Sequence, residues 1–416
     1  MRNRIIIISL TFVVLFASLS AALSGSERKK RDDLYRQVEL FADTLAIIQS
    51  DYMEEVKPKD LIYGALKGML SSLDAHSQFM DPDTYNELKV DTKGNFGGLG
   101  IEITIKDGLL TVITPIEGTP AWRAGLKPGD RIVKINNELT RDLTLTEAVK
   151  KMRGKPGEAA NLTVLRESEK KVLEFKIVRA IIKIKDIKEA KILEDGIGYI
   201  RLVEFRENTP ADFNAALERL SKKGMNSLIL DLRNNPGGLL ESAVDITGEF
   251  IPKGKLVVYT RGRKNDQDVQ FVAHTLHPML NIPLVILINE GSASGSEIVA
   301  GALQDYKRAT IVGATSFGKG SVQTVIPLSD GSALRLTTSK YFTPLGKVIH
   351  NKGVVPDVII SPEKEADKNQ EILEEAGLKD KPLTDKKPLD YKSDLQISSA
   401  LEILKTGKID NKAGSK

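Results

Sequence analysis

The chain has 416 residues, which at roughly 150 residues per domain predicts two or three domains. Charged residues make up 28% and hydrophobic residues 41%, an ordinary globular composition that excludes a wholly disordered, collagenous or polytopic membrane chain. The 60 lysines and arginines exceed the 56 acidic residues by only four, far from the basic balance of a dedicated nucleic-acid binder. The lack of cysteine excludes thiol nucleophiles, disulfides and cysteine-ligated metals.

The first predicted element is an uncharged stretch from Ile5 to Leu23 that follows two arginines. Its length suits a membrane span or an export signal, and Ser20 with Ala22 suits a signal-peptidase site. Cleavage and retention are both left open, so residues 1–26 are assigned as a signal peptide or an N-terminal membrane anchor. In either case we expect export to the cell envelope, in the periplasm or on the outer face of the cytoplasmic membrane.

Residues 27–87 are predicted to be a helical part of the core. Apolar residues from Leu34 to Tyr52 recur at helical spacing and form one stripe, which we expect to be buried against another surface. A second helix is predicted after Asp60, with Leu61 and Met69 on one face.

From about residue 90 the pattern changes to short alternating segments broken by glycine, which is typical of β structure. Segments 101–105 and 109–113 flank a Lys-Asp-Gly turn. The run GTPAWRAGLKPGDRIVKIN at 118–136 adds a short helix, a Pro-Gly turn and a buried strand. This arrangement resembles a PDZ domain, which we place at residues 88–178.

The glycine-rich run from Phe96 to Ile101, FGGLGI, resembles the carboxylate-binding loop of PDZ domains. In such a loop, successive backbone N–H groups form a nest for the terminal carboxylate of a peptide, and glycine allows the close approach. Gly98, Leu99, Gly100 and Ile101 are therefore the candidate residues that bind a substrate C-terminus. A glycine-rich hairpin without a ligand is the alternative for the loop taken alone.

Beyond residue 181, strands and helices alternate, which predicts a layered α/β catalytic core over residues 179–360. We expect strands at 197–203, 227–232, 256–259 and 284–288, with helices at 212–222 and from residues 239 and 294. The apolar runs 228–230 and 283–288 indicate strands buried on both faces. The charged region 361–416 is predicted to be solvated, with one docked helix near 394–405.

Two of these strands end in unusual turns, DLRNNPGG at 231–238 and NEGSASGSE at 289–297. Both place glycine and small polar residues where a buried strand leaves its sheet, which is where open α/β sheets bind ligands. A serine in such a turn can be held beside oxyanion donors, although helix capping is the commoner role for a serine-rich turn.

A serine nucleophile needs a base, because an unassisted hydroxyl is weak. The four histidines, His76, His274, His277 and His350, have no spacing that marks one of them as that base. Lys319 lies between two glycines among small and apolar residues, and burial would lower its pKa as a lysine base requires. An ordinary exposed lysine on a flexible turn is the alternative from spacing alone.

Together the motifs resemble the carboxyl-terminal processing peptidase family, also called tail-specific proteases. The motifs are DLRNNPGG at 231–238, NEGSASGSE at 289–297, FGKGSVQ at 317–323 and the inserted PDZ domain. The resemblance covers about residues 30–360 and the helix near 394–405. It implies a mixed α/β fold, with a layered crotonase/ClpP-like core interrupted by a mostly β PDZ domain and flanked by helical N-terminal and C-terminal segments.

The resemblance also implies a role for each site residue. Ser294 matches the family's nucleophile, Lys319 its general base and Gln323 the residue that orients the lysine. A backbone N–H of Gly237 or Gly238 would stabilise the oxyanion.

Gly295 would donate the second oxyanion N–H, in a position where the family commonly has alanine. Arg153, at the end of a predicted PDZ helix, is a candidate for coupling that domain to the core through a charge-assisted bond. A solvated turn arginine is the alternative. No metal cluster is evident, and serine-lysine chemistry needs no metal or cofactor.

The implied function is that of an exported serine endopeptidase that captures the free C-terminus of a protein substrate and cleaves near it. Its expected partners are proteins or peptides with free, apolar C-termini. A regulatory or adaptor protein and a second copy of the chain are further candidates, and nucleic acid is not expected. Two alternatives are an inactive envelope PDZ scaffold and a crotonase-like acyl-CoA enzyme, the latter having no reason to contain a PDZ insertion.

Overall fold

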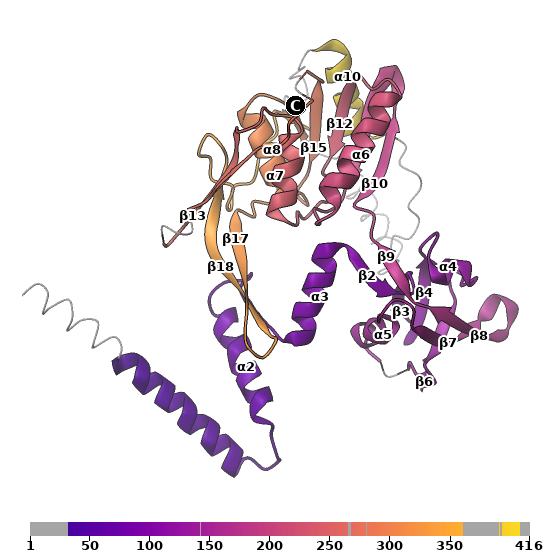
Figure 1. Cartoon of the computed structure of the whole chain (residues 1–416), viewed down its shortest axis with the longest axis vertical. Coiled ribbons are helices and arrows are strands. Elements are labelled where there is room, and N and C mark those ends of the chain that lie inside the picture. The colour runs from indigo at the N-terminus through magenta and orange to yellow at the C-terminus, as the bar shows by residue number, and fades with distance from the viewer. Residues whose placement is uncertain are drawn as a thin grey trace, which may run out of the picture.

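The structure of the chain is a computed structural model that describes residues 32–141, 143–264, 268–279, 281–360, 391 and 393–407 (Figure 1). The expected signal or anchor at residues 1–26 lies outside the described residues, as does most of the charged region 361–416. Within the part that is described, no helix is long and apolar enough to span a bilayer.

The core is built on a six-stranded sheet with strand order β10-β11-β12-β15-β16-β19. Its strands are β10 Ile187–Ile192, β11 Ile197–Leu202, β12 Ser227–Asp231, β15 Leu284–Ile288, β16 Thr310–Gly313 and β19 Val358–Ile359. β10 pairs antiparallel with β11, and every later pairing is parallel. All residues of β12 and β15 are buried, as their apolar runs predicted.

Helices cover both faces of this sheet. Successive side chains of a strand point to opposite faces, so strands that are apolar throughout need cover on both sides. The helices are α6 Thr209–Lys222, α7 Leu240–Gly248, α8 Gly295–Asp305 and α10 Leu395–Thr406. Leu228 and Leu230 of β12 pack in the hydrophobic layer with α6, α7 and α8. Ile229 between them packs in the opposite layer with α10, the docked helix that was predicted near 394–405.

A second, antiparallel sheet carries a long hairpin formed by β17 and β18. Its strands are β1 Gln78–Met80, β13 Leu256–Gly262, β14 Gln270–Val272, β17 Ser321–Pro327 and β18 Ala333–Phe342. The hairpin extends from the core toward α2 (Pro58–Ser71) (Figure 1). Tyr63 of α2 packs edge-on against Phe79 of β1, with ring centroids 4.8 Å apart.

The predicted PDZ module forms a separate β structure beside the core (Figure 1). Its elements are β2 Asn95–Gly98, β3 Ile101–Lys106, β4 Leu109–Pro115, α4 Pro120–Arg123, β5 Arg131–Ile135, β6 Glu138–Leu139, α5 Leu145–Met152, β7 Ala159–Arg166, β8 Lys171–Val178 and β9 Ala180–Lys183. Short 3-10 turns lie at Glu167–Glu169 and, in the core, at Glu194–Gly196. The module has its own hydrophobic centre, with Ile132, Ala160 and Val164 fully buried.

The module is joined to the core on two sides. Helix α3 (Pro82–Lys93) leads from the core into β2. β2 then pairs antiparallel with β9, which returns the chain to β10 of the core sheet. The entering and leaving strands of the module therefore lie side by side, and α3 lies between the β17–β18 hairpin and the module (Figure 1).

The N-terminal helix forms as predicted, over residues 32–51, but its apolar stripe is not buried. Leu34, Val38 and Phe41 are 63%, 56% and 44% exposed. The helix projects away from the rest of the chain in Figure 1. The described residues therefore do not supply the surface against which this stripe was expected to pack.

Replacing Ile397 by alanine tests how much α10 contributes to the core. Ile397 is fully buried against the sheet, whereas Leu395 on the same helix is 50% exposed. We expect Ile397→Ala to lower the free energy of unfolding by about 2–5 kcal/mol, because it leaves a cavity. Thermal unfolding followed by circular dichroism measures the loss. An equal effect from Leu395→Ala would contradict docking of α10 through Ile397.

Candidate active site

The serine-rich turn after β15 holds Ser294 in a strained backbone conformation, with φ 52° and ψ −110°. A residue other than glycine in such a region costs about 1–3 kcal/mol and persists only where its surroundings fix it. The turn is fixed from the neighbouring strand end. The Ala293 N–H and the Ser296 hydroxyl both donate to the Asn235 carbonyl, at 3.0 and 2.9 Å.

A buried carboxylate, Glu297, joins the serine turn to the lysine loop. Its Oε2 accepts the backbone N–H groups of Ser294, at 2.8 Å, and of Lys319, at 2.9 Å. Its Oε1 accepts the Ser316 hydroxyl and the Gly318 N–H, both at 2.6 Å. One oxygen atom of Glu297 therefore accepts a hydrogen bond from the backbone of each of the two predicted catalytic residues.

Burial and hydrogen bonding have opposite effects on the pKa of Glu297. Burial raises the pKa of Glu297, while the Ser316 hydroxyl and three backbone N–H groups favour its ionised form. Glu297 also lies in the first turn of α8, where the helix dipole stabilises negative charge. Sequence analysis did not single out this residue, although the Ser-x-x-Glu spacing that marks a capping box was visible.

Lys319 occupies a partly buried loop just before β17. Burial lowers the pKa of Lys319, the positive charge of Arg335 lowers it further, and Glu297 opposes both. The flanking Gly320 has no room for a side chain, because a Cβ there would lie 2.3 Å from the backbone nitrogen of His350. His350 therefore supports the lysine loop from behind.

The amide nitrogen of Gln323 donates to the Ser321 hydroxyl at 2.9 Å and to the Thr337 hydroxyl at 3.4 Å. Orientation of the lysine by Gln323 is not tested by these contacts and stays a prediction. Thr337 in turn donates to Asp74 at 3.2 Å, and its N–H donates to Ser77. Asp74 and Ser77 thus support the strand beside Gln323.

The Asn-Pro-Gly-Gly turn lies directly against Ser294. A Cβ on Gly237 would be 2.7 Å from the Ser294 Cβ and from the Gly295 nitrogen. The Gly237 N–H already donates to the Asn235 side chain at 2.9 Å. Among the described residues, the N–H groups of Gly238 and Gly295 have no hydrogen-bond acceptor.

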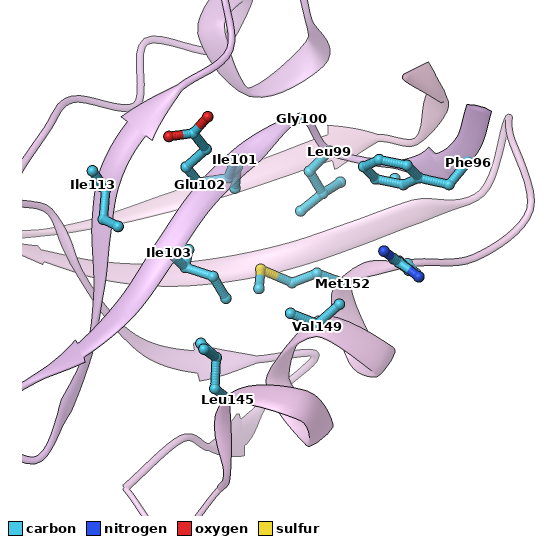
Figure 2. A pocket seen from close by; sticks show the side chains of 12 residues that line it. Phe96, Leu99, Gly100, Ile101, Glu102, Ile103, Ile113, Leu145, Val149 and Met152 are labelled. Carbon is cyan, nitrogen blue, oxygen red and sulfur yellow. The ribbon is translucent and has the colours of Figure 1, made fainter. Parts of the chain in front are cut away.

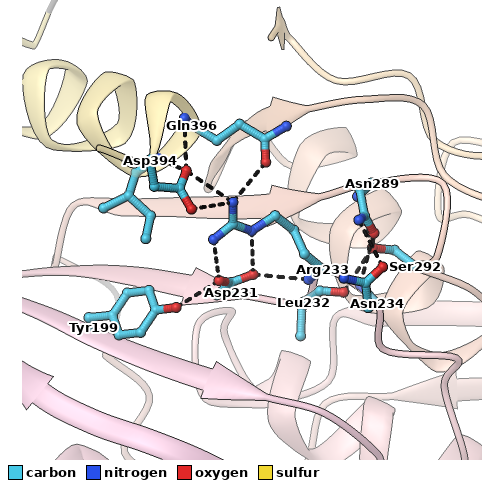
Figure 3. A network of polar contacts seen from close by, with 10 residues as sticks. Tyr199, Asp231, Leu232, Arg233, Asn234, Asn289, Ser292, Asp394 and Gln396 are labelled. Carbon is cyan, nitrogen blue, oxygen red and sulfur yellow. Dashed lines mark hydrogen bonds and ion pairs between the residues drawn. The ribbon is translucent and has the colours of Figure 1, made fainter. Parts of the chain in front are cut away.

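An ion-pair network holds the same turn from its other side (Figure 3). The Arg233 guanidinium donates to buried Asp231 at 2.7 and 2.9 Å and to Asp394 at 2.8 and 3.1 Å. Asp231 also accepts the Tyr199 hydroxyl at 2.7 Å. Because Asp394 caps α10 through the Gln396 and Ile397 N–H groups, the C-terminal helix is tied to the start of the glycine turn.

The predicted carboxylate-binding loop lines a groove of about 400 Å³ between β3 and α5. Gly98, Leu99, Gly100 and Ile101 all border it. Most of the side chains that line it are apolar, with those of α5 facing those of β3 and the loop (Figure 2). Gly100 has φ +80°, and a Cβ there would lie 2.3 Å from Thr119, so only glycine fits.

Arg153 lies at the loop end of this groove and is not a free turn residue. Its guanidinium carbon lies 4.7 Å from the centre of the Phe96 ring, and a guanidinium nitrogen lies 3.6 Å from a carboxylate oxygen of Asp91 on α3. The structure thus brings Arg153 into contact with the helix that leads to the core.

Three family models match the chain in regions that agree with this architecture. The model described as peptidase family S41 matches residues 196–360, a PDZ domain model matches 111–166, and the activating protease CtpB N-terminal domain model matches 15–84.

Relatives match over most of the chain. A carboxy-terminal-processing protease of Bartonella bacilliformis is 42% identical over 410 residues, which cover 94% of each chain. Carboxy-terminal processing protease CtpB of Bacillus subtilis is 38% identical over 344 residues, covering 82% of this chain and 70% of that protein. Among solved structures, the photosystem II D1 C-terminal processing protease is 30% identical, covers 78% of this chain and 87% of its own, and has a TM-score of 0.45.

The peptidase match leaves no support for an acyl-CoA enzyme. With the Bartonella protein aligned over almost its whole length, and with the S41 and PDZ models each matched, the chain belongs to peptidase family S41 and is a carboxy-terminal processing serine protease with a PDZ domain.

Proposed function

We propose that the chain is an endopeptidase that cleaves near the C-terminus of protein substrates by Ser294 and Lys319 acyl-enzyme chemistry. The observation that carries the proposal is the Glu297 carboxylate, which accepts the backbone N–H of both residues. The proposal is supported by the lowered pKa of Lys319, which burial causes, and by the strained backbone of Ser294, whose N–H shares the Glu297 oxygen with that of Lys319.

In the proposed reaction the neutral Lys319 amine takes the proton of the Ser294 hydroxyl as the oxygen attacks the substrate carbonyl. The resulting ammonium then protonates the leaving amine, and an acyl-enzyme remains on Ser294. Lys319 next removes a proton from the water that attacks the ester, and it returns this proton to the Ser294 oxygen as the acid leaves. Gln323 would orient the lysine, as the family resemblance implies.

Two backbone donors are proposed for the oxyanion, those of Gly238 and Gly295. Gly237 is the weaker candidate because its N–H is already bonded to Asn235. The Gly295 N–H lies at the start of α8, where the helix dipole adds to the stabilisation of negative charge.

The groove between β3 and α5 is the proposed site for the substrate's C-terminus. The Gly98–Ile101 loop supplies backbone N–H groups for the carboxylate, and Arg153 adds a positive charge at the same end. The apolar walls formed by Leu145, Val149 and Ile103 suit apolar terminal side chains.

Export and membrane attachment through residues 5–23, with a location in the cell envelope, are kept as part of the proposal on the apolar sequence of that stretch. A regulatory or adaptor protein and a homo-oligomer are likewise proposed partners. The exposed stripe on the helix over residues 32–51 supports the oligomer, since such a stripe normally packs against another surface.

Replacing the two reactive residues tests the proposed Ser-Lys chemistry. Ser294→Ala and Lys319→Ala should each reduce hydrolysis of an unstructured peptide by at least 1,000-fold, on the order of effects seen when a catalytic residue is removed. Lys340→Ala, at an exposed position on β18, is the matched lysine control. A serine-directed probe should label the wild type and not Ser294→Ala. Activity retained in either variant, or a wild type without activity or labelling, would overturn the assignment.

Amidation of the substrate tests recognition of the free C-terminus. An amide loses the charge that the loop would bind, and hydrogen bonds to a charged group contribute about 1.5–3 kcal/mol. We therefore expect kcat/KM for a peptide amide to be about 10- to 100-fold below that of the matched acid. Equal turnover of the two peptides would rule out capture of the terminal carboxylate.

The pH dependence of activity should report the ionisation of Lys319. Because its neutral form is the base, activity should rise with pH through an apparent pKa below the ordinary value of 10.5. Arg335→Gln removes a neighbouring positive charge, so Lys319 should hold its proton more tightly and the rise should move to higher pH. Arg335→Lys keeps the charge and should leave the profile near that of the wild type. A shift to lower pH in Arg335→Gln would contradict the role of Lys319.

A further inference from the structure

The C-terminal end of α3 is capped by one short segment of the core, residues 206–208. Nε of Arg206 donates to the Asp91 carbonyl at 3.0 Å, the Glu207 N–H donates to Thr92 at 3.2 Å, and Nδ2 of Asn208 donates to Lys93 at 3.3 Å. The last carbonyls of a helix lack partners further along it, although the Asp91 carbonyl also accepts the N–H of the cap residue Gly94 at 3.1 Å. A guanidinium at this end is also favoured by the helix dipole.

Arg206 is itself held firmly, with only 11% of its side chain exposed. Its guanidinium donates to Asp186 and Glu204, and Asp186 also accepts the Thr209 hydroxyl at 2.5 Å. The α3 cap residue, Gly94, has no room for a side chain, since a Cβ there would lie 2.8 Å from the Arg206 Cδ. Arg206 therefore holds the C-terminal end of α3 against the core.

The residue before it, Phe205, clamps the proposed oxyanion turn. Its N–H donates to the Gly237 carbonyl at 2.9 Å, and its carbonyl accepts the Leu239 N–H at 2.7 Å. A Cβ on Gly238 would lie 2.0 Å from that carbonyl oxygen, and a Cβ on Gly295 would lie 3.2 Å from the Phe205 ring. Phe205 thus touches both proposed oxyanion donors.

At the other side of α3, Asp91 connects to the groove. Its carboxylate pairs with Arg153 at 3.6 Å while its carbonyl accepts Arg206. A peptide carboxylate bound at the loop end of the groove would compete with Asp91 for the Arg153 guanidinium. Asp91 therefore contacts a residue of the groove, Arg153, through its side chain and a residue of the catalytic core, Arg206, through its backbone carbonyl.

We propose that Arg206 is a positioning residue that links occupation of the groove to the placement of the oxyanion turn. Arg153 contacts the Asp91 side chain, and the Asp91 carbonyl accepts a hydrogen bond from Arg206. Phe205, the residue before Arg206, contacts Gly238 and Gly295. The link rests on the proposed function and names the core residues through which substrate binding acts on catalysis. Since such coupling is reciprocal, breaking the contact at Asp91 also changes peptide affinity.

The kinetic test compares Arg206→Gln with Arg206→Lys and with Arg308→Gln. Arg308 is a matched control, because it too is partly buried and donates to backbone carbonyls, those of Phe250 and Met279. We expect Arg206→Gln to lower the acid-to-amide ratio of kcat at least fivefold, with a smaller change in KM, and Arg206→Lys to restore part of it. Arg308→Gln should keep the wild-type ratio even if its thermal stability falls. An unchanged ratio in Arg206→Gln, or the same loss in Arg308→Gln, would overturn the link.

A binding test is independent of catalysis and uses a fluorescent peptide that ends in a free apolar residue. Asp91→Asn should raise the peptide's affinity by about 2- to 10-fold, because Arg153 no longer has a competing partner. Asp83→Asn makes the same charge change on the same helix, where Asp83 pairs with Lys150 of α5, and should raise affinity by less than twofold. Equal gains in both variants, or no gain in Asp91→Asn, would contradict the link.

The two tests separate failure of the link from failure of the proposed function. If the wild type prefers the acid and Arg206→Gln keeps that preference, the link is wrong and the peptidase proposal stands. If the wild type hydrolyses neither peptide, the catalytic proposal fails, and the link to catalysis fails with it. The affinity of Asp91→Asn then still shows whether Arg153 is shared between Asp91 and the peptide.

Discussion

The carboxylate of Glu297 is the interaction on which the rest of the site depends. A buried charge is costly unless hydrogen bonds surround it, and Glu297 is fully buried with four donors on its two oxygens. Those donors come from the serine turn, which follows β15 of the core sheet, and from the lysine loop, which connects β16 of that sheet to β17 of the second sheet. Satisfying one carboxylate therefore requires both segments to be in place together, and it also holds Ser294 in its strained conformation.

The glycine turn is constrained in a complementary way, from two sides. Asp231 and Arg233 fix its beginning and tie it to α10 through Asp394, as Figure 3 shows. Phe205 fixes its end by hydrogen bonds around Gly238. These contacts at both ends restrict the turn, and backbone donors stabilise an oxyanion most effectively when they are held in position.

Much of this architecture could be predicted from local pattern. The apolar runs at β12 and β15 and the glycines after them are signals within a few residues, so the strands and turns followed directly, whereas the choice of Ser294 within its turn came from the family resemblance. Contacts between distant segments left no such signal. Arg233 and Asp394 are far apart in sequence, and the Ser-x-x-Glu pattern around Glu297 predicts only a helix cap, not its bonds to the lysine loop. The sequence predicted the apolar stripe that begins at Leu34, but it did not predict that this stripe is exposed to solvent.

The packing around Gly295 gives a physical reason for glycine at this position. The family that the sequence resembles commonly has alanine at this position. In the structure the space where a Cβ would project is bordered by the Phe205 ring and by Ala243, at 3.2 and 3.4 Å. An alanine there would press on Phe205, whose backbone holds Gly237 and Leu239. Glycine therefore allows the ring to pack directly against residue 295, so that the segment carrying Phe205 and Arg206 contacts both proposed oxyanion donors.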